Sequence, residues 1–334
     1  MRAVQITQPK EIQFVELPTP KPGPSEVLIK VAAAGICGTD LHIYHGDYEA
    51  VYPIIPGHEF SGTVAAIGEN VKWVKPGDRV TADPNIPCNR CPACQRGHAN
   101  QCQDHQAVGV TRDGAFSEFV VVPEEVVFHI GKMPFNAAAM VEPLACVVWG
   151  LQRIQIQAGD SALVFGAGPM GCLVAQAVQH ASAAQVVVTD VNTARLAMIQ
   201  QLGIQQTIQG PGGEDRIREL NPSGYDVVVD ATGIPEVLEW AFDFVRPRGK
   251  IWVFGVVPPD EKVKFSPYEV FRRDLTIIGS FAVNRTFHEA VALIQNGAVQ
   301  VEPLISHQIP LDHFREAIDL AQHDPDRMKV QIIP

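Results

Sequence analysis

The sequence predicts an α/β protein of two domains, one mostly β and one built on a doubly wound parallel sheet. Its 334 residues exceed the roughly 150 that one domain usually holds. Through about residue 140, short apolar runs such as 26–31 and 115–122 are separated by Gly and Pro, which is typical of an irregular β domain. From Leu144 on, apolar runs of strand length alternate with segments of helix length, which indicates βα units.

The elements of the second domain follow from these runs. The apolar runs show little alternation, so both faces of their sheet should be covered by helices. Strands are expected at residues 161–165, 185–189, 225–230, 250–254 and 275–278. Helices are expected from the glycine-rich turn to His180 and over 193–202, where Gly203 supplies a C-terminal cap. Amphipathic helices are expected over 287–296 and 312–323.

Charge and composition exclude several classes of partner. The chain carries 37 acidic and 26 basic side chains, a net charge of −11, which argues against binding nucleic acid or an anionic membrane. A phosphate-bearing cofactor remains compatible, because backbone N–H groups at a helix start can bind phosphate. No signal-peptide pattern and no stretch of about 18 uninterrupted apolar residues is seen, and the odd number of cysteines, seven, fits a reducing compartment. A cytoplasmic location is the expectation.

Four cysteines form one cluster. Cys88, Cys91, Cys94 and Cys102 have the spacing C-x2-C-x2-C-x7-C. Two-residue gaps let one turn direct successive sulfurs to one point, and the longer gap lets the chain return to close a tetrahedral shell. Buried or disulfide-bonded cysteines are the alternative, which a reducing compartment disfavours. The cluster predicts a structural zinc site with no open coordination position.

A second metal site is suggested by Cys37, His58 and one carboxylate, either Glu59 or Glu142. Catalytic zinc keeps about three protein ligands and an open position. Each residue alone is more often a core or surface residue, but all lie in turns flanked by Gly or Pro, where function concentrates. Zinc there would act as a Lewis acid that lowers the pKa of an alcohol.

The proton released from the alcohol needs a path to solvent. Thr39 and His42 follow Cys37 by two and five residues and could supply a hydroxyl and an imidazole for this relay. His45 is a nearby alternative, which otherwise would be a solvated loop residue.

The run Gly166-Ala-Gly-Pro-Met-Gly171 matches G-x-G-x-x-G between an expected strand and helix, which is the context of a dinucleotide-binding turn. Asp190 ends the next expected strand, where a carboxylate would accept hydrogen bonds from ribose hydroxyls and repel a 2′-phosphate, which favours NAD over NADP. Arg195 could lie near the adenosine, although a surface helix charge is the alternative. The expected cofactor-binding residues are Gly166, Gly168, Pro169, Met170, Gly171, Asp190 and Arg195.

With these residues, the chain resembles the zinc-dependent medium-chain alcohol dehydrogenases, and within them the polyol (sorbitol-type) and threonine dehydrogenase branch. The resemblance covers essentially the whole chain. Its motifs are the four-cysteine loop and residues 35–42, 57–62, 77–80, 141–143 and 166–171.

The resemblance implies a GroES-like catalytic domain of residues 1–143, completed by 281–334, around a Rossmann NAD-binding domain of residues 144–280. It implies two Zn²⁺ per subunit, one catalytic and one structural, an active site between the domains, and a homo-oligomer, either a dimer or a tetramer.

It also implies roles for individual residues. Cys37 and His58 would bind the catalytic zinc, with Glu59 as direct ligand and Glu142 as alternate or water-mediated ligand. Thr39 and His42 match proton-relay positions, and Tyr44 and Phe116 match substrate-pocket positions.

Two positions depart from the polyol pattern. Ala115 replaces a Gly before Phe116, and Ala282 stands where an Arg usually contacts substrate hydroxyls, with Arg285 three residues later. Loss of that polar contact favours smaller or less hydroxylated secondary alcohols.

The sequence therefore predicts an oxidoreductase that transfers a hydride from a secondary alcohol, a polyol or sugar derivative, to NAD and yields a ketone. A threonine- or sugar-acid-type dehydrogenase is the alternative within the family. A non-catalytic NAD-binding sensor on the same fold is the alternative from another class.

Overall fold

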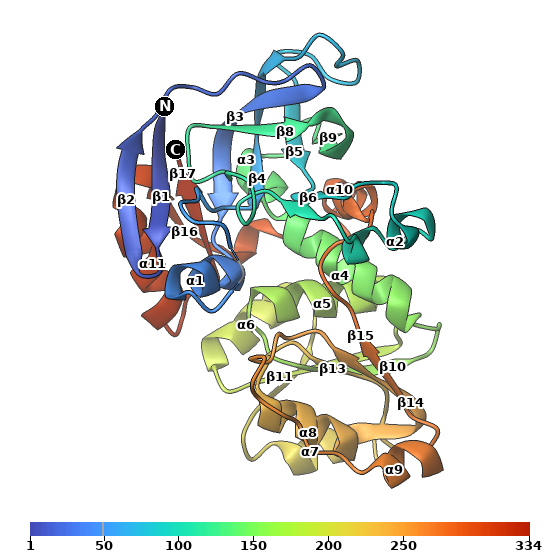
Figure 1. Ribbon diagram of the computed structural model, residues 1–334. Coiled ribbons are helices and arrows are strands. Elements are labelled where there is room, and N and C mark those ends of the chain that lie inside the picture. The colour runs from blue at the N-terminus through green and yellow to red at the C-terminus, as the bar shows by residue number, and fades with distance from the viewer. Residues whose placement is uncertain (49) are drawn as a thin grey trace. The chain divides into compact units, whose positions relative to one another are not determined.

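A computed structural model describes residues 1–48 and 50–334, which divide into two compact units (Figure 1). Unit 1 comprises Met1–Ala145, Val283–Gln295 and Leu304–Pro334, and unit 2 comprises Cys146–Ala282 and Asn296–Pro303. The sequence places all of 281–334 in the first domain, whereas residues 296–303 belong to unit 2. Hydrogen bonds hold residues 296–303 in unit 2: the Gln300 backbone N–H donates to Oε1 of Gln176 at 2.8 Å, and Nε2 of Gln176 donates to the Gln300 carbonyl at 3.1 Å.

Unit 1 is built on a seven-stranded sheet of order β16-β17-β3-β4-β5-β9, with β8 paired to β3. Most of its neighbouring strands are antiparallel, and its apolar face forms one buried cluster that includes Val27, Ile29 and Phe60. Two small two-stranded sheets, β1-β2 and β6-β7, complete the β structure. The strands are β1 (Arg2–Gln8), β2 (Glu11–Glu16), β3 (Glu26–Gly35), β4 (Glu59–Ile67), β5 (Arg79–Ala82), β6 (Asn85–Ile86), β7 (Gln106–Ala107), β8 (Phe119–Pro123), β9 (Val127–His129), β16 (Ile305–Pro310) and β17 (Lys329–Ile333).

The helices of unit 1 are short, and one of them positions the candidate site. Helix α1 starts directly after Cys37 and ends at Gly46, whose φ of +88° is the left-handed conformation that glycine adopts without strain. The helices are α1 (Gly38–His45), α2 (Pro92–Gln95), α3 (Phe135–Ala138), α10 (Phe287–Gln295) and α11 (Phe314–His323), and α4 (Val141–Ile154) begins in unit 1 and continues into unit 2.

One expected strand of unit 1 begins later than the sequence indicates. The apolar run 115–122 predicts a strand, but β8 starts at Phe119. The backbone N–H groups of Ala115 and Phe116 donate instead to the carbonyls of Gly57 and Pro56, at 2.9 and 3.0 Å. This segment therefore supports the turn that precedes His58.

Unit 2 contains a six-stranded, fully parallel sheet of order β12-β11-β10-β13-β14-β15. In order along the unit this is 3-2-1-4-5-6, the doubly wound dinucleotide-binding arrangement. The strands are β10 (Ser161–Phe165), β11 (Gln185–Asp190), β12 (Gln206–Gln209), β13 (Tyr225–Asp230), β14 (Val245–Val253) and β15 (Thr276–Gly279). The helices are α5 (Pro169–His180), α6 (Thr193–Gln201), α7 (Glu214–Leu220), α8 (Pro235–Phe244) and α9 (Pro267–Arg272).

The predicted fold class, a Rossmann-type parallel sheet with a second, mostly β part, is confirmed. The strands of this sheet are apolar without alternation because they are buried, as expected: Leu163, Val187 and Val228 are fully buried. The segment Phe135–Ile154 is apolar and long enough to cross a membrane by length and composition, yet 72% of its most apolar window is buried inside the protein, as in a core helix.

Candidate functional site

Three of the predicted metal ligands lie together in unit 1. The donor atoms of Cys37, His58 and Glu59 are all within 4.8 Å of one another. Strand pairing produces this arrangement, because Gly35 at the end of β3 is opposite Glu59 at the start of β4. Cys37 follows the one strand and His58 precedes the other, so residues about twenty positions apart meet where these two central strands end and begin.

Asp40 holds this group in place. Its carboxylate accepts hydrogen bonds from the backbone N–H of Cys37 at 2.8 Å and of Gly57 at 3.1 Å. It is 1% exposed, and Oδ1 lies 3.6 Å from Nδ1 of His58. Both turns that carry the ligands are thus fixed to one buried carboxylate.

The imidazole of His58 is placed so that it could bind a cation. Its Nδ1 is buried and makes no hydrogen bond within the described residues, 1–48 and 50–334. Burial is the largest influence on the pKa of His58 and lowers it, but the charges of Asp40 and Cys37 more than offset this and raise the pKa well above its usual range. A cation is therefore favoured here, and one soft sulfur, one imidazole and one carboxylate form a donor set that fits zinc.

Glu59 also has a partner that the sequence did not predict. Nζ of Lys329, from β17, donates to Oε1 and Oε2 of Glu59 at 2.7 and 2.8 Å. The side chains are 6% and 1% exposed. Burial is the largest influence on the pKa of Lys329 and lowers it, but the charges of Glu59, Cys37 and Glu142 together with the hydrogen bonds to Glu59 outweigh burial, and the pKa is raised. Glu59 is therefore a buried carboxylate with a permanent cation on both oxygens.

Glu142, the other candidate carboxylate, lies outside the group of three mutually close donors. It is 8% exposed, and burial raises its pKa to about 7. His58 and Lys329 lower this pKa, whereas Glu59 and Asp83 raise it, so Glu142 lies in the electrostatic field of the same site.

The four clustered cysteines are also brought together. The sulfurs of Cys88, Cys91, Cys94 and Cys102 lie within 4.8 Å of one another. Backbone N–H groups point at them, from Cys88 to Cys102 Sγ at 3.2 Å and from Cys91 to Cys88 Sγ at 3.4 Å. Backbone hydrogen bonds lower the pKa of Cys88, whereas burial raises that of Cys94 to about 12 in the absence of a metal ion. Four mutually close sulfurs are the donor set of a closed tetrahedral zinc site.

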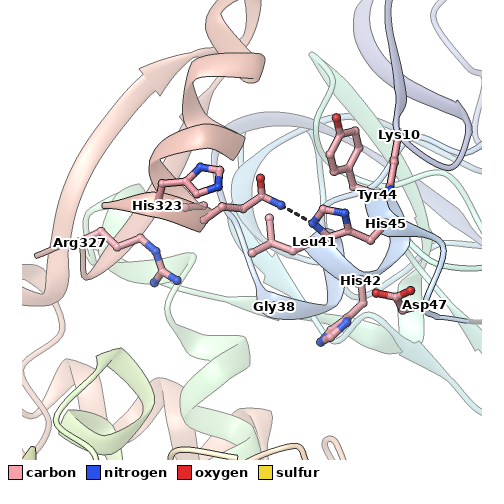
Figure 2. A pocket seen from close by; sticks show the side chains of 11 residues that line it. Lys10, Gly38, Leu41, His42, Tyr44, His45, Asp47, His323 and Arg327 are labelled. Carbon is pink, nitrogen blue, oxygen red and sulfur yellow. Dashed lines mark hydrogen bonds between the residues drawn. The ribbon is translucent and has the colours of Figure 1, made fainter. Parts of the chain in front are cut away.

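The two candidate relay residues occupy different surroundings. Oγ1 of Thr39 lies 3.8 Å from Sγ of Cys37. His42 lines an open cavity of about 610 Å³ between α1 and the end of α11, together with Tyr44 and His45 (Figure 2). His45 is paired with Gln322 across this cavity, as the dashed line in Figure 2 marks, whereas no such pair is drawn for His42.

The structure separates the two expected substrate-pocket residues. Tyr44 lines the cavity of Figure 2. Phe116 is fully buried in the core of unit 1, where its ring packs against Phe314 at a centroid distance of 4.8 Å. The core position of Phe116 accompanies the hydrogen bonds of Ala115 and Phe116 to the turn before His58, described above.

The glycine-rich turn of unit 2 has the predicted context, since it joins the end of β10 to the start of α5. Gly166 has a φ of +101°, and a Cβ on Gly171 would lie 1.9 Å from the Gly166 carbonyl oxygen, so helix and strand approach this closely only with glycine at both positions. Gly168 is the N-cap of α5, and Pro169 and Met170 begin its first turn. Pro169 has no N–H, so at these two positions only the N–H of Met170 is available to a phosphate, as helix starts commonly provide.

Asp190 ends β11, beside the turn, as predicted. Its carboxylate accepts hydrogen bonds from the N–H of Ala167 at 2.6 Å and of Asn192 at 2.8 Å. Nη1 of Arg195 lies 3.9 Å from the position a Cβ would take on Gly168. The acid and the cation therefore both border the glycine-rich turn.

Comparison with known proteins identifies the family. Residues 23–132 match the alcohol dehydrogenase GroES-like domain, and residues 169–296 match the zinc-binding dehydrogenase domain. D-altritol 5-dehydrogenase of Agrobacterium fabrum is 39% identical over 99% of both chains. L-threonine 3-dehydrogenase of Mesorhizobium japonicum is 34% identical, covering 92% of this chain and 91% of that one.

Among solved structures, a zinc-binding dehydrogenase from Sinorhizobium meliloti bound to NADP has a TM-score of 0.96 at 34% identity, covering 100% of this chain and 99% of that one. The chain belongs to the zinc-dependent medium-chain alcohol dehydrogenases, in the polyol and threonine dehydrogenase branch. It is an alcohol oxidoreductase that works with zinc and a nicotinamide dinucleotide.

Sequence reasoning missed Asp40, Asp83 and Lys329. Asp40 had a local signal. It follows the N-cap residue of α1, Cys37, by three positions, and an acid at that position commonly accepts a hydrogen bond from the backbone N–H of the N-cap residue. Lys329 had a weaker one, a single cation inside an apolar C-terminal strand. Asp83 follows an ordinary strand and carried no signal.

Asp83 gives a pH-dependent prediction. Burial raises the pKa of its carboxyl to about 6, despite two hydrogen bonds donated by Asn85. The unfolded chain has the lower pKa, so the folded state holds a proton that the unfolded state has lost between about pH 4 and 6, and stability falls as pH rises through this window. Asp83→Asn should abolish that fall and raise the free energy of unfolding at pH 7 by about 1 to 2 kcal/mol.

Denaturant unfolding at pH 4.5, 6 and 7.5 measures the effect. The exposed Asp312→Asn is the control and should leave the pH dependence as in the wild type. An unchanged pH dependence in Asp83→Asn would show that Asp83 is ionised in the folded protein.

Proposed function

We propose that the chain oxidises a secondary alcohol of a polyol or sugar derivative to a ketone and transfers the hydride to NAD. The observation that carries the proposal is that one chain combines the Cys37, His58 and Glu59 group with a dinucleotide turn that ends beside Asp190. The 39% identity to a D-altritol 5-dehydrogenase supports a polyol as substrate.

In this proposal Cys37, His58 and Glu59 hold the catalytic zinc, which supplies Lewis-acid activation of the alcohol when bound. Asp40 keeps the two ligand-bearing turns together. Thr39, beside Cys37, would accept the alcohol proton while donating its own hydroxyl proton onward, and the solvent-exposed His42 would release the relayed proton to water. His45 is the weaker relay candidate because Gln322 engages its ring. The cysteine loop holds the second, structural zinc.

A hydroxy amino acid is the second candidate substrate class, and the 34% identity to an L-threonine 3-dehydrogenase favours it. A polyol stays the first choice because the identity to the altritol enzyme is higher and extends over the whole chain. A non-catalytic sensor should lack a ligand or a relay residue, and this chain has a complete set of both.

We also propose that the protein is a cytoplasmic homo-oligomer. Edge strand β15 pairs only with β14 among the strands that the structure describes, and Ile277 on it is 40% exposed. Nearby in the sequence, Phe271 and Phe281 are 79% and 56% exposed, which suits burial against a second copy. The seven cysteines form no disulfide within residues 1–48 and 50–334, which suits a reducing compartment.

The substrate class is tested with a panel of polyols, aldonates and hydroxy amino acids, with zinc and NAD saturating and NADH absorbance as the readout. Turnover should be highest on a secondary alcohol of a polyol, and the product should be a ketone. A preference for L-threonine would move the enzyme to the second class, and no activity on the whole panel would contradict the proposal.

The two zinc sites give a matched pair of variants. Cys37→Ala should lose about one zinc per chain and at least a thousandfold in turnover, while NAD still binds, because its turn lies in unit 2. Cys94→Ala should also lose one zinc but mainly lower the melting temperature. Metal analysis, NADH fluorescence and thermal unfolding separate the two effects. Equal loss of activity through unfolding in both would argue against two distinct sites.

The cofactor preference depends on Asp190. Asp190→Ser removes a carboxylate that would repel a 2′-phosphate, so kcat/KM with NADP relative to NAD should rise by about ten- to a hundredfold. The exposed Asp260→Ser serves as control. A wild-type enzyme that already prefers NADP, like the cofactor bound in the Sinorhizobium structure, would contradict the assignment.

A further inference from the structure

The carboxylate of Glu59 has two competing uses. It is one of three mutually close metal donors, and both of its oxygens also accept hydrogen bonds from the Lys329 ammonium group, at 2.7 and 2.8 Å. The third hydrogen of that ammonium group points to the Ile36 carbonyl at 3.2 Å. All three donors of Lys329 are therefore used, and its position is fixed.

Strand geometry forces the contact. In β17, Gln331 pairs with Gly35 of β3, and Gly35 pairs in turn with Glu59 of β4. A Cβ on Gly35 would lie 2.2 Å from Oε2 of Glu59. The absence of a side chain at Gly35 thus leaves the space in which the carboxylate lies and meets a lysine from two strands away.

The charges explain why this contact matters to a metal. A thiolate from Cys37 and a carboxylate from Glu59 together cancel the two charges of Zn²⁺, with His58 neutral. Lys329 returns one positive charge to the oxygens that would bind the ion. In a buried site a charge this close acts strongly on a second cation, because little water screens it.

We propose that Lys329 is a positioning residue that weakens the bond between Glu59 and the catalytic metal ion. This inference rests on the proposed catalytic site of Cys37, His58 and Glu59. The ion pair keeps Glu59 as an exchangeable ligand rather than a permanent one. Glu142, buried and within the field of both Glu59 and Lys329, is the carboxylate available to replace it.

If Lys329 had a purely structural role, its removal would change the metal affinity in the opposite direction. If Lys329 served only to neutralise Glu59, removing it would loosen the fold and the metal site together. In our proposal its removal frees Glu59 for the metal, so the metal binds more tightly even though the metal-free protein is less stable. The sign of the change in metal affinity therefore distinguishes the two roles.

The experiment measures the affinity of the catalytic site for Co²⁺ by chelator competition, in proteins purified with zinc and without cofactor. Lys329→Met should bind Co²⁺ about tenfold more tightly than the wild type or more. Lys329→Arg, which keeps the charge, should stay within about twofold. The visible spectrum of thiolate-bound Co²⁺ should be retained in each, which shows that Cys37 still binds the ion.

Two controls isolate the ion pair. Lys250→Met removes a lysine of unit 2 whose Nζ donates to the carbonyls of Ile154 and Gln155, and it should leave the Co²⁺ affinity unchanged. In a Glu59→Gln background, Lys329→Met should no longer tighten binding through the carboxylate, so the two substitutions should be non-additive.

Unchanged or weaker Co²⁺ binding in Lys329→Met would overturn the inference. Should that variant not fold, Lys329→Gln keeps an amide donor without the charge and should show the same tightening. Failure of both to fold with zinc present would mean that the pair serves the fold alone and would also overturn it. A wild-type protein that holds only one metal ion, with Cys37→Ala no different, would instead refute the catalytic site itself.

Discussion

The candidate metal site depends on buried charges that compensate one another at the ends of β3, β4 and β17. Asp40, Glu59 and Lys329 are each at most 6% exposed at the side chain or the whole residue, where an unpaired charge would be costly. Asp40 is satisfied by two backbone N–H groups, and Glu59 by Lys329. The strand order β17-β3-β4 is the arrangement that brings these partners together. The fold of unit 1 therefore buries these charged side chains and supplies a partner for each of them.

Unit 2 offers backbone groups, and not a cluster of charged side chains, to an anionic ligand. The chain has a net charge of −11, yet it must hold an anionic dinucleotide. We propose that its turn does so with N–H groups at the start of α5 and a close Gly166–Gly171 approach rather than with a cluster of cations. Asp190 contributes by fixing the turn through the N–H of Ala167. In our proposal, the same acidic group that selects the ribose thus also supports the loop that would bind the phosphates.

Local patterns in the sequence predicted the features that local geometry decides. The strand at 161–165, the helix that starts at Thr193 and the left-handed Gly203 all lie where the sequence indicates, because each depends on neighbouring residues. The pair of Lys329 and Glu59 could not be found this way, since 270 positions separate them and only β pairing brings them together. Residues 115–118 also escaped prediction, because the N–H groups of Ala115 and Phe116 bond to a distant turn and that of Glu118 bonds to Arg2 of β1. The class of chemistry followed from motifs, whereas the electrostatics of the site required the fold.

The chain around the end of β15 bears on the choice of substrate. Polyol enzymes that this chain resembles carry an Arg where it has Ala282, and Arg285 is the nearest replacement in the sequence. The structure gives Arg285 another partner, because its guanidinium donates to Oδ1 of Asn89 at 3.3 Å in the cysteine loop. The adjacent Asn284 ties the same loop through Ala99 and Gly97. Arg285 is thus tied to the cysteine loop that we propose holds the structural zinc. For the proposed function, this arrangement would disfavour a substrate that needs an arginine from this segment for its hydroxyls and would favour a less hydroxylated secondary alcohol.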